Sequence, residues 1–280
     1  RPRRQGHGHR RTASEQAMKL ADVFAKAASE HRAALVAYLS FGDPDPATSI
    51  DVIAAAAAAG ADVIELGVPF SDPSADGPSI QRAMERALLA GGSLTGALDA
   101  TAELRRRGVT TPIVLFGYYN PIFVMGTAVF AARAAAAGVD AVLTVDLPID
   151  ELAELATPLA EHGVDVIPLV APTSTPGRIA RLAAFHPPFV YYISITGVTG
   201  SRAASLPEPA RLAAIREASG APVAVGFGIR TPADAAPFAA IADGVVVGTA
   251  IVERVGSGPP FDAASRVAEL VSSLARAMSR

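Results

Sequence analysis

Two carboxylates in the segment IELGVPFSDPSADGPSIQ, residues 64–81, stand where acid–base chemistry is possible. Glu65 lies in an apolar run between Ile64 and Leu66, and Asp76 follows eleven residues later, before a Gly-Pro pair. Because desolvation disfavours a charged carboxylate, a buried one is costly unless it is paired or has a chemical task. We expect the pKa of Glu65 to be raised toward neutrality, so that this group can give and take a proton. Asp76, in a polar loop, should stay ionised and accept a hydrogen bond.

Each carboxylate also has a plain structural explanation. Glu65 could be satisfied by backbone N–H groups, while Asp72 and Asp76 precede Pro and Gly, as ordinary turn residues do. Asp146 precedes a Leu-Pro pair, which favours a structural role for it. The chemical interpretation of Glu65 and Asp76 rests on their unlike surroundings, because two carboxylates in different environments can divide acid and base roles.

Other catalytic groups are scarce in the chain. It has no cysteine, and its two lysines, Lys19 and Lys26, precede the first strand candidate, so a Schiff-base lysine on a strand is not expected. The five histidines lie in the N-terminal tail or in helices and helix-to-strand joints: His7, His9, His31, His162 and His186. No metal cage assembles from such positions. We therefore expect carboxylate chemistry without a metal or cofactor.

Short apolar runs predict the strands that position these groups. Eight of them recur, at 34–40, 61–67, 112–117, 141–146, 164–170, 189–194, 222–227 and 244–249. They are apolar on both faces, as parallel strands covered by helices are. Longer segments rich in Ala, Leu, Arg and Glu follow them and predict helices, among others at 46–59, 151–162, 176–184 and 206–219. Glycines that suit helix C-caps stand at the joints, at positions 60, 108, 138, 163 and 220.

Eight such βα units predict an α/β fold, a single (β/α)₈ TIM barrel with an extra N-terminal helix over 15–31. A doubly wound open sheet is the alternative, because periodicity does not show closure. In a barrel the chemistry lies at the C-terminal ends of the strands and in the loops after them. Glu65 near the end of the second strand and Asp76 in the loop after it should therefore face the same mouth.

Three glycine-bearing loops follow the last three strands: GVTGS (197–201), GFGIR (226–230) and GTAIVE (248–253). Glycine lets backbone N–H groups approach an anion, and a helix beginning near Thr249 would add its positive end. Each loop alone could be a tight turn, but together they predict a phosphorylated ligand. They argue against a glycosidase, as does the absence of Trp. The tyrosines could line an apolar pocket for a flat aromatic ring: Tyr38, Tyr118, Tyr119, Tyr191 and Tyr192.

Charge divides the chain into two parts. The first eleven residues, RPRRQGHGHRR, hold five Arg and no acid, whereas the whole chain of 280 residues has a net charge of −3. We expect a disordered Arg-rich extension over 1–14 and a catalytic domain over 15–280, although a nucleic-acid arm or a targeting segment would fit the extension as well. The acidic body should not bind nucleic acid, and no apolar run approaches the ~18 residues that cross a membrane. The absence of cysteine favours a cytoplasmic protein.

These residues closely resemble the tryptophan synthase alpha subunit family. The likeness begins with ELGVPFSDPSADGPSIQ and extends through FGDP (41–44), YYNPI (118–122), VDLPIDE (145–151), YYISITGVTG (191–200), VGFGI (225–229) and VGTAIVE (247–253). It implies cleavage of indole-3-glycerol phosphate to indole and glyceraldehyde 3-phosphate, in the last steps of tryptophan biosynthesis. It also implies a beta-subunit partner in an α₂β₂ heterotetramer.

The resemblance further implies roles for single residues. Glu65 is the proton shuttle at the indole ring and the glycerol hydroxyl, Asp76 is the partner of the indole N–H, and Tyr191 lies near Glu65. Tyr118 belongs to the substrate-binding set. The phosphate grip is matched by Gly200, Gly228, Gly248 and Thr249. Two residues depart from the family: Ser74, where Leu is usual, and Ile195, where Arg is frequent.

Three interpretations stay open. The chain is an alpha subunit that docks a beta subunit through residues 71–73 and the loop after the third strand, or it is a stand-alone lyase with the same catalytic residues. The third is a phosphate-binding regulatory subunit with little turnover, against which the intact Glu65 and Asp76 argue. We also expect residues 196–207 to form a mobile lid, because this loop is long and rich in Gly, Ser and Ala.

Overall fold

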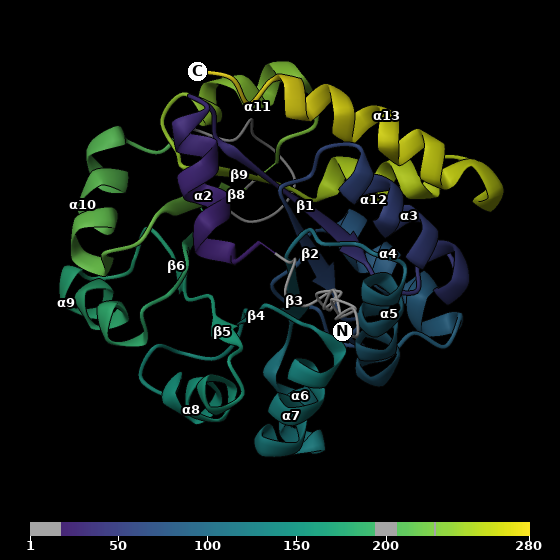
Figure 1. The fold of residues 1–280 in the computed structure, drawn as a ribbon, viewed down its shortest axis with the longest axis horizontal. Helices are drawn as coiled ribbons and strands as arrows, with labels where there is room; N and C mark the ends of the chain where they lie inside the picture. The colour runs from purple at the N-terminus through teal and green to yellow at the C-terminus, as the bar shows by residue number, and fades with distance from the viewer. Residues whose placement is uncertain (1–17, 194–205, 227) are drawn as a thin grey trace, which may run out of the picture.

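Nine parallel strands and the helices around them make up the computed structural model, which describes residues 18–193, 206–226 and 228–280 (Figure 1). The strands lie in one sheet in the order β5-β4-β3-β2-β1-β9-β8-β7-β6. They are β1 (Ala34–Ser40), β2 (Val63–Gly67), β3 (Ile113–Gly117), β4 (Ala141–Thr144), β5 (Asp165–Val166), β6 (Leu169–Val170), β7 (Val190–Ile193), β8 (Val223–Gly226) and β9 (Gly244–Val247). Each of the eight predicted apolar runs contains a strand.

The two ends of this order, β5 and β6, are halves of one segment separated by Ile167 and Pro168. The Ile167 N–H donates to the carbonyl oxygen of Val142 in β4 at 2.9 Å, and the Pro168 carbonyl accepts from the Tyr191 N–H in β7 at 3.0 Å. The segment therefore bridges β4 to β7 and closes the sheet, as the predicted TIM barrel requires. The predicted strand 164–170 is interrupted at Pro168, which has no N–H to donate to a neighbouring strand.

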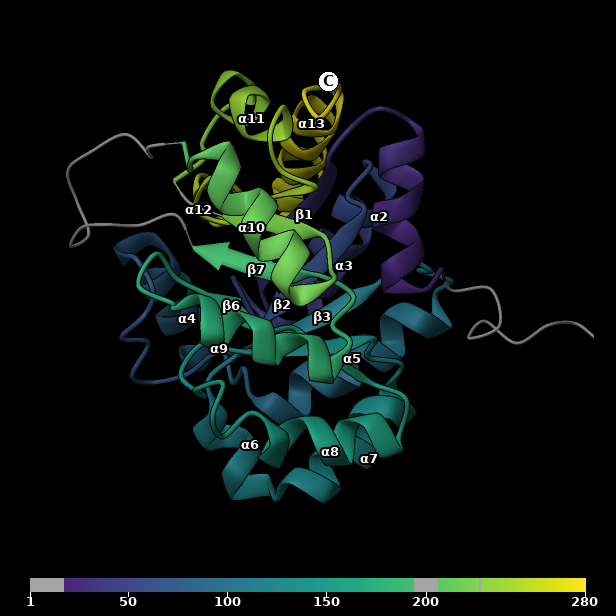
Figure 2. The same ribbon diagram turned by 90° about the vertical axis from the view of Figure 1, so that its left-hand side faces the viewer.

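Helices follow the strands and cover the outside of the sheet (Figures 1 and 2). They are α2 (Leu20–Ser29), α3 (Pro46–Ala58), α4 (Pro78–Leu89), α5 (Leu94–Arg106), α6 (Tyr119–Met125), α7 (Thr127–Ala137), α8 (Ala153–Glu161), α9 (Pro176–Ala180), α10 (Pro209–Ser219), α11 (Pro232–Ala239), α12 (Thr249–Gly256) and α13 (Ala263–Arg276), with the 3₁₀ turns η1 (Arg181–Phe185) and η2 (Pro260–Asp262). The five joint glycines have positive φ, which suits a helix end: Gly60, Gly108, Gly138, Gly163 and Gly220.

Alternation along the strands separates two layers of core. On β1, Leu35 and Leu39 pack in the layer shared with the helices, whereas Val36 and Tyr38 pack in the barrel interior. Such alternation is the period-2 geometry of a strand. On β2, Ile64 and Leu66 belong to the outer layer, so the residue between them, Glu65, points into the barrel.

The predicted extra N-terminal helix is present as α2, and it closes the N-terminal ends of the strands. Leu20, Val23 and Phe24 pack into the barrel interior, and the Phe24 ring lies 4.9 Å from the ring of Phe189. Figure 2 shows α2 on one side of the barrel, with the β7 arrow pointing to the other side. The opposite end, where the strands finish, is left for the site.

Three aspartates fix the strand starts at this closed end. Each stands directly before a strand, pairs with an arginine and accepts an N–H from the start of the preceding strand. The sets are Asp62 with Arg32 and Leu35, Asp140 with Arg105 and Ile113, and Asp243 with Arg216 and Val223. Charge-assisted bonds of this kind hold strand register at the base of the barrel.

Candidate active site

Glu65 lies on β2 with its side chain in the barrel interior. It is in register with Tyr38 on β1 and Val114 on β3. The residue is fully buried, and neither carboxylate oxygen has a hydrogen-bond partner among the described residues, so backbone satisfaction is not seen. Burial, followed by the nearby charge of Asp76, raises the pKa of Glu65 to about 8. The rise expected from its apolar neighbours is confirmed, and the group is suited to proton transfer near neutral pH.

Asp76 lies in the loop between β2 and α4, and its surroundings differ from the expected polar loop. The residue is 7% exposed, and its Oδ2 accepts a hydrogen bond from the Tyr118 hydroxyl at 2.7 Å. Burial raises the pKa of Asp76 and outweighs this hydrogen bond, which lowers it. Asp76 is therefore more buried than a residue of the expected polar loop, because the loop folds over Tyr118, the residue that follows β3. The expected hydrogen bond to Asp76 is present.

Tyr118, at the end of β3, holds the Asp76 loop from inside. Its hydroxyl also accepts the N–H of Ala75 at 3.0 Å, and its ring stacks on Phe70 at 4.9 Å. From the other side, the Gln81 amide donates to the Asp76 carbonyl oxygen at 2.9 Å. Tyr118 thus contacts the proposed catalytic aspartate directly, whereas the sequence assigned it only to substrate binding.

Two phenols share the interior with Glu65. Tyr191 on β7 and Tyr38 on β1 are both neutral donors, because burial raises the pKa of each well above its usual value. For Tyr191 the next cause is the charge of Glu65, as expected of a residue near that group. Each phenol fits because a neighbouring strand has glycine: a Cβ on Gly226 would lie 2.3 Å from the Tyr191 oxygen, and one on Gly67 would lie 2.3 Å from the Tyr38 oxygen.

Tyr38 is a site residue to which the sequence analysis gave no specific role. It appeared there only as one of five tyrosines, but its register beside Glu65 places it in the site. Its ring meets Phe116 edge to face at 5.3 Å, and its hydroxyl lies 3.3 Å from the Ser40 Oγ. The alternation of β1 was the signal that could have found it, because Val36, Tyr38 and Ser40 share one face.

The structure describes some of the residues that were predicted to bind phosphate. Gly228 follows β8 with φ +63°, and Gly248 precedes α12, which begins at Thr249 as expected. A Cβ on Gly248 would lie 3.4 Å from the Tyr38 side chain, so this helix start borders the residues around Glu65. Gly200, Ile195, the Arg-rich extension and most of the expected lid lie outside the described residues.

The comparison with known families decides where this chain belongs. The sequence model of the family described as "Tryptophan synthase alpha chain" matches residues 24–279. The chain belongs to the tryptophan synthase alpha chain family. Members of this family are carbon–carbon lyases that cleave indole-3-glycerol phosphate, and the chain shares that activity.

Individual members of the tryptophan synthase alpha chain family are similar over nearly the whole length. The alpha chain of Geobacter sulfurreducens is 50% identical over 261 residues, which are 93% of this chain and 98% of the relative. That of Chromobacterium violaceum is 46% identical and covers 93% and 99%. Among solved structures, tryptophan synthase from Mycobacterium tuberculosis matches with a TM-score of 0.84 at 38% identity, covering 94% of this chain and 99% of the other. The alpha subunit from Legionella pneumophila gives 0.82 at 36%, covering 94% and 99%.

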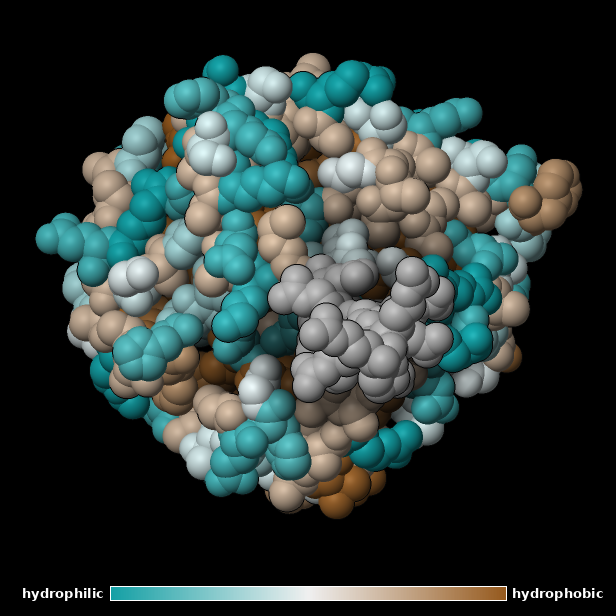
Figure 3. Space-filling model, in the orientation of Figure 1, coloured by the Kyte–Doolittle hydropathy of each residue, from teal (hydrophilic) through white to brown (hydrophobic). Residues whose placement is uncertain are grey.

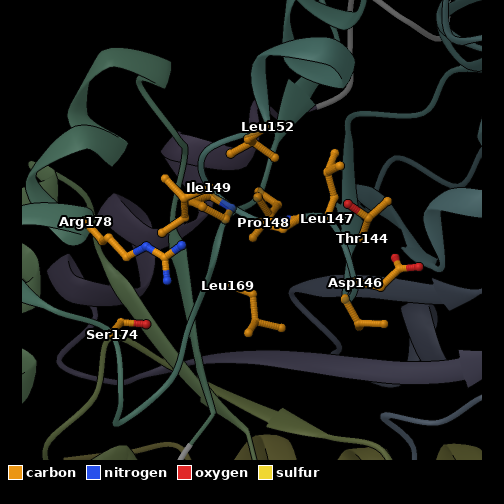
Figure 4. A pocket seen from close by; sticks show the side chains of 12 residues that line it. Thr144, Asp146, Leu147, Pro148, Ile149, Leu152, Leu169, Ser174 and Arg178 are labelled. Atoms are coloured by element: carbon orange, nitrogen blue, oxygen red, sulfur yellow. The ribbon is translucent and has the colours of Figure 1, made fainter.

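A cleft lies where the strand is interrupted at Pro168, between the loop after β4 and the segment after β6. Its volume is about 240 Å³. Figure 4 shows Arg178 and Ser174 on one side, Thr144 and Asp146 on the other, and Ile149 and Leu169 between them. Asp146 accepts the Tyr119 N–H at 2.8 Å, which supports the structural role expected for it. Glu65 and Asp76 do not line this cleft, which we read as the rim of the barrel mouth.

No group of three or more His, Cys, Asp or Glu side chains could hold a metal ion in the parts of the chain that the structure covers. Within the same ranges no single helix is long and apolar enough to cross a membrane. Only α6 and α7 reach that length and apolar composition when taken together, and the pair is bent by 101°.

Proposed function

We propose that Glu65 and Asp76 carry out the cleavage of indole-3-glycerol phosphate in this chain, with Glu65 as the acid and base and Asp76 as the acceptor of the indole N–H. One observation carries this assignment. Glu65 is fully buried, lacks a hydrogen-bond partner among the described residues, and has a pKa raised to about 8. A carboxylic acid held in that state can donate a proton at neutral pH and take one back.

The reaction then needs two proton transfers at one group. Protonated Glu65 gives its proton to C3 of the indole, which makes the ring a positive indolenine. The Asp76 carboxylate stabilises this charge through the ring N–H, while Tyr118 keeps Asp76 in place. The Glu65 carboxylate next removes the proton of the glycerol hydroxyl beside the breaking bond. As the carbonyl forms, the C–C bond breaks, its electron pair returns to the ring, and indole and glyceraldehyde 3-phosphate result.

The phosphate would be held by backbone groups at Gly200, Gly228, Gly248 and Thr249. The start of α12 supports this, because the free N–H groups of a helix N-terminus favour an anion. Tyr191 and Tyr38 would enclose the indole ring next to Glu65. Their neighbours Gly226 and Gly67 leave the room that both phenols need.

Replacing Glu65 with Gln tests the assignment. The variant keeps the shape of the side chain but has no proton to exchange, so turnover should fall by about 10²-fold or more. Binding of a non-cleavable indole-alkyl phosphate should stay within about twofold, since Gln fills the same space. Turnover near that of the unaltered protein would reject Glu65 as the proton shuttle.

We also propose that the chain works in the cytoplasm within an α₂β₂ assembly with a beta subunit. Phe123 and Val124 on α6 are 66% and 77% exposed, and Figure 3 shows a hydrophobic patch at the lower edge of the molecule over α6 and α7. This patch lies on the helices after β3, and the stacked rings of Phe70 and Tyr118 join the start of α6 to the segment that leads into residues 71–73, which we expect to dock a partner. Exposed apolar patches mark interaction sites. Indole release with and without added beta subunit separates the three interpretations: strong activation indicates the complex, equal turnover a stand-alone lyase, and no turnover a regulatory subunit.

A further inference from the structure

Glu253, on the second turn of α12, joins three segments that are far apart in the sequence. Its Oε1 accepts the Ser79 hydroxyl at 2.7 Å, in the first turn of α4. Its two oxygens each lie 3.3 Å from the guanidinium of Arg230, in the loop after β8. The side chain is 37% exposed, so it lies at the edge of the barrel mouth and not in the interior.

Each of these segments carries one of the residues assigned above. Ser79 is three positions after Asp76, Arg230 is two positions after Gly228, and Glu253 is four positions after Thr249. The start of α4 is tied to Asp76 by a further bond, since Gln81 on the same helix binds the Asp76 carbonyl oxygen. A shift of Glu253 would therefore act on the aspartate loop and on the phosphate loops together.

We propose that Glu253 is a positioning residue that couples the phosphate loops to the loop of Asp76. This inference rests on the proposed function of those loops. A phosphate held at Gly228 and Thr249 fixes α12 and the Arg230 loop, and the Glu253 carboxylate passes that constraint to Ser79 and the start of α4. The bound phosphate thereby adds to the hold that Tyr118 and Gln81 have on the loop of Asp76.

Separate variants should divide the effect between turnover and substrate affinity. Ser79→Ala should lower kcat by about three- to tenfold with little change in KM, because it frees the aspartate loop. Arg230→Ala should raise KM by about three- to tenfold with little change in kcat, because it frees a phosphate loop. Glu253→Ala should show both effects. Glu253→Gln should restore kcat alone, since its amide oxygen still accepts the Ser79 hydroxyl but has no charge for Arg230.

The experiment measures kcat and KM for indole-3-glycerol phosphate by indole release, with Glu269→Ala as the matched control. Glu269 is an exposed acid on α13. If Ser79 acts through Glu253, the double variant Ser79→Ala/Glu253→Ala has the kcat of Glu253→Ala. Losses that multiply, or Glu253→Ala matching the control in both constants, would overturn the coupling. Should Glu253→Ala fail to fold, Glu253→Gln tests the proposal instead. A kcat equal to that of the unaltered protein together with a raised KM supports the coupling, and a lowered kcat overturns it.

Failure of the proposed function has a different signature. In that case the unaltered protein releases no indole, or Glu65→Gln retains full turnover. With both of those results as expected, a silent Glu253→Ala rejects the coupling alone.

Discussion

Glu65 loses its hydration on folding and gains no hydrogen bond from the described residues. With a pKa of about 8, its neutral acid is the dominant form at neutral pH. The nearby Asp76 contributes to that rise, so the two groups titrate as a coupled pair. The same burial therefore makes Glu65 costly as an anion and suitable as an acid, and two consequences of pH can be measured.

The first consequence concerns activity. Since the cleavage starts from protonated Glu65 and ionised Asp76, kcat/KM should decline above an apparent pKa of about 8, and it should also decline at low pH where Asp76 takes up a proton. Initial rates of indole release between about pH 6 and about pH 10 would show this limb. Circular dichroism at each pH controls for unfolding. A rate that rises steadily through pH 8 would contradict a protonated starting state.

The second consequence concerns stability. The pKa of Glu65 is higher in the folded protein than its ordinary value of 4.5, so between these values the folded state binds more protons than the unfolded one. The free energy of unfolding should then fall as pH rises through that window. Glu65→Gln removes this dependence and should be more stable than the unaltered protein by a few kcal/mol above pH 8. Denaturant titration of both proteins at about pH 5, near the lower end of the window, and at about pH 9, above its upper end, would measure the difference. Equal pH slopes for the two proteins would mean that Glu65 is hydrated.

At the scale of elements, β8 makes space for a side chain of β7. Gly226→Ala would place a methyl group 2.3 Å from the Tyr191 oxygen and 3.0 Å from Val246, so the phenol must move. We expect kcat/KM to fall by about tenfold or more, because small displacements in a site are costly to catalysis. Gly177→Ala on α9 is the control, since its added methyl group meets nothing within 4 Å. If Gly226→Ala retains full activity, Tyr191 does not line the substrate.

The elements themselves could be predicted from the sequence, and their cross-connections could not. Eight apolar runs mark the strands because both faces of each are buried, and Glu65 stood out as the exception within one run. Asp76 was expected in a polar loop, and its burial was missed because nothing local shows that Tyr118, directly after β3, lies beneath that loop. The bond of Glu253 to Ser79 depends on the pairing of the first strand with the last, and its bond to Arg230 joins the segments after β8 and β9. Pairings of that kind depend on the path of the chain, which periodicity does not describe.

In the molecule as a whole, the closed base of the barrel contributes to stability, and the open mouth contains the active site. Phe24 is buried in the interior and packs on Phe189. Phe24→Ala should lower the free energy of unfolding by about 3–5 kcal/mol, through lost contacts and a cavity, yet leave kcat of the folded protein unchanged. Phe123→Ala is the matched control, because that ring is 66% exposed and should change stability little. A loss of kcat at temperatures where Phe24→Ala stays folded would show that the base and the mouth are coupled.

The pairing of β1 with β9 also determines when β1 can complete its hydrogen bonds during translation. Ala34 pairs in register with Gly244, and its N–H donates to the Asp243 carbonyl oxygen at 2.9 Å. The ribosome adds Gly244 about 210 residues after Ala34. At about 5–20 residues per second, the first strand waits on the order of 10–40 s with one edge unpaired. Its seven residues are all buried in the finished barrel, and an exposed apolar edge is a template for pairing with other chains. The unpaired edge of β1 is therefore open to pairing with other chains until β9 emerges and covers it.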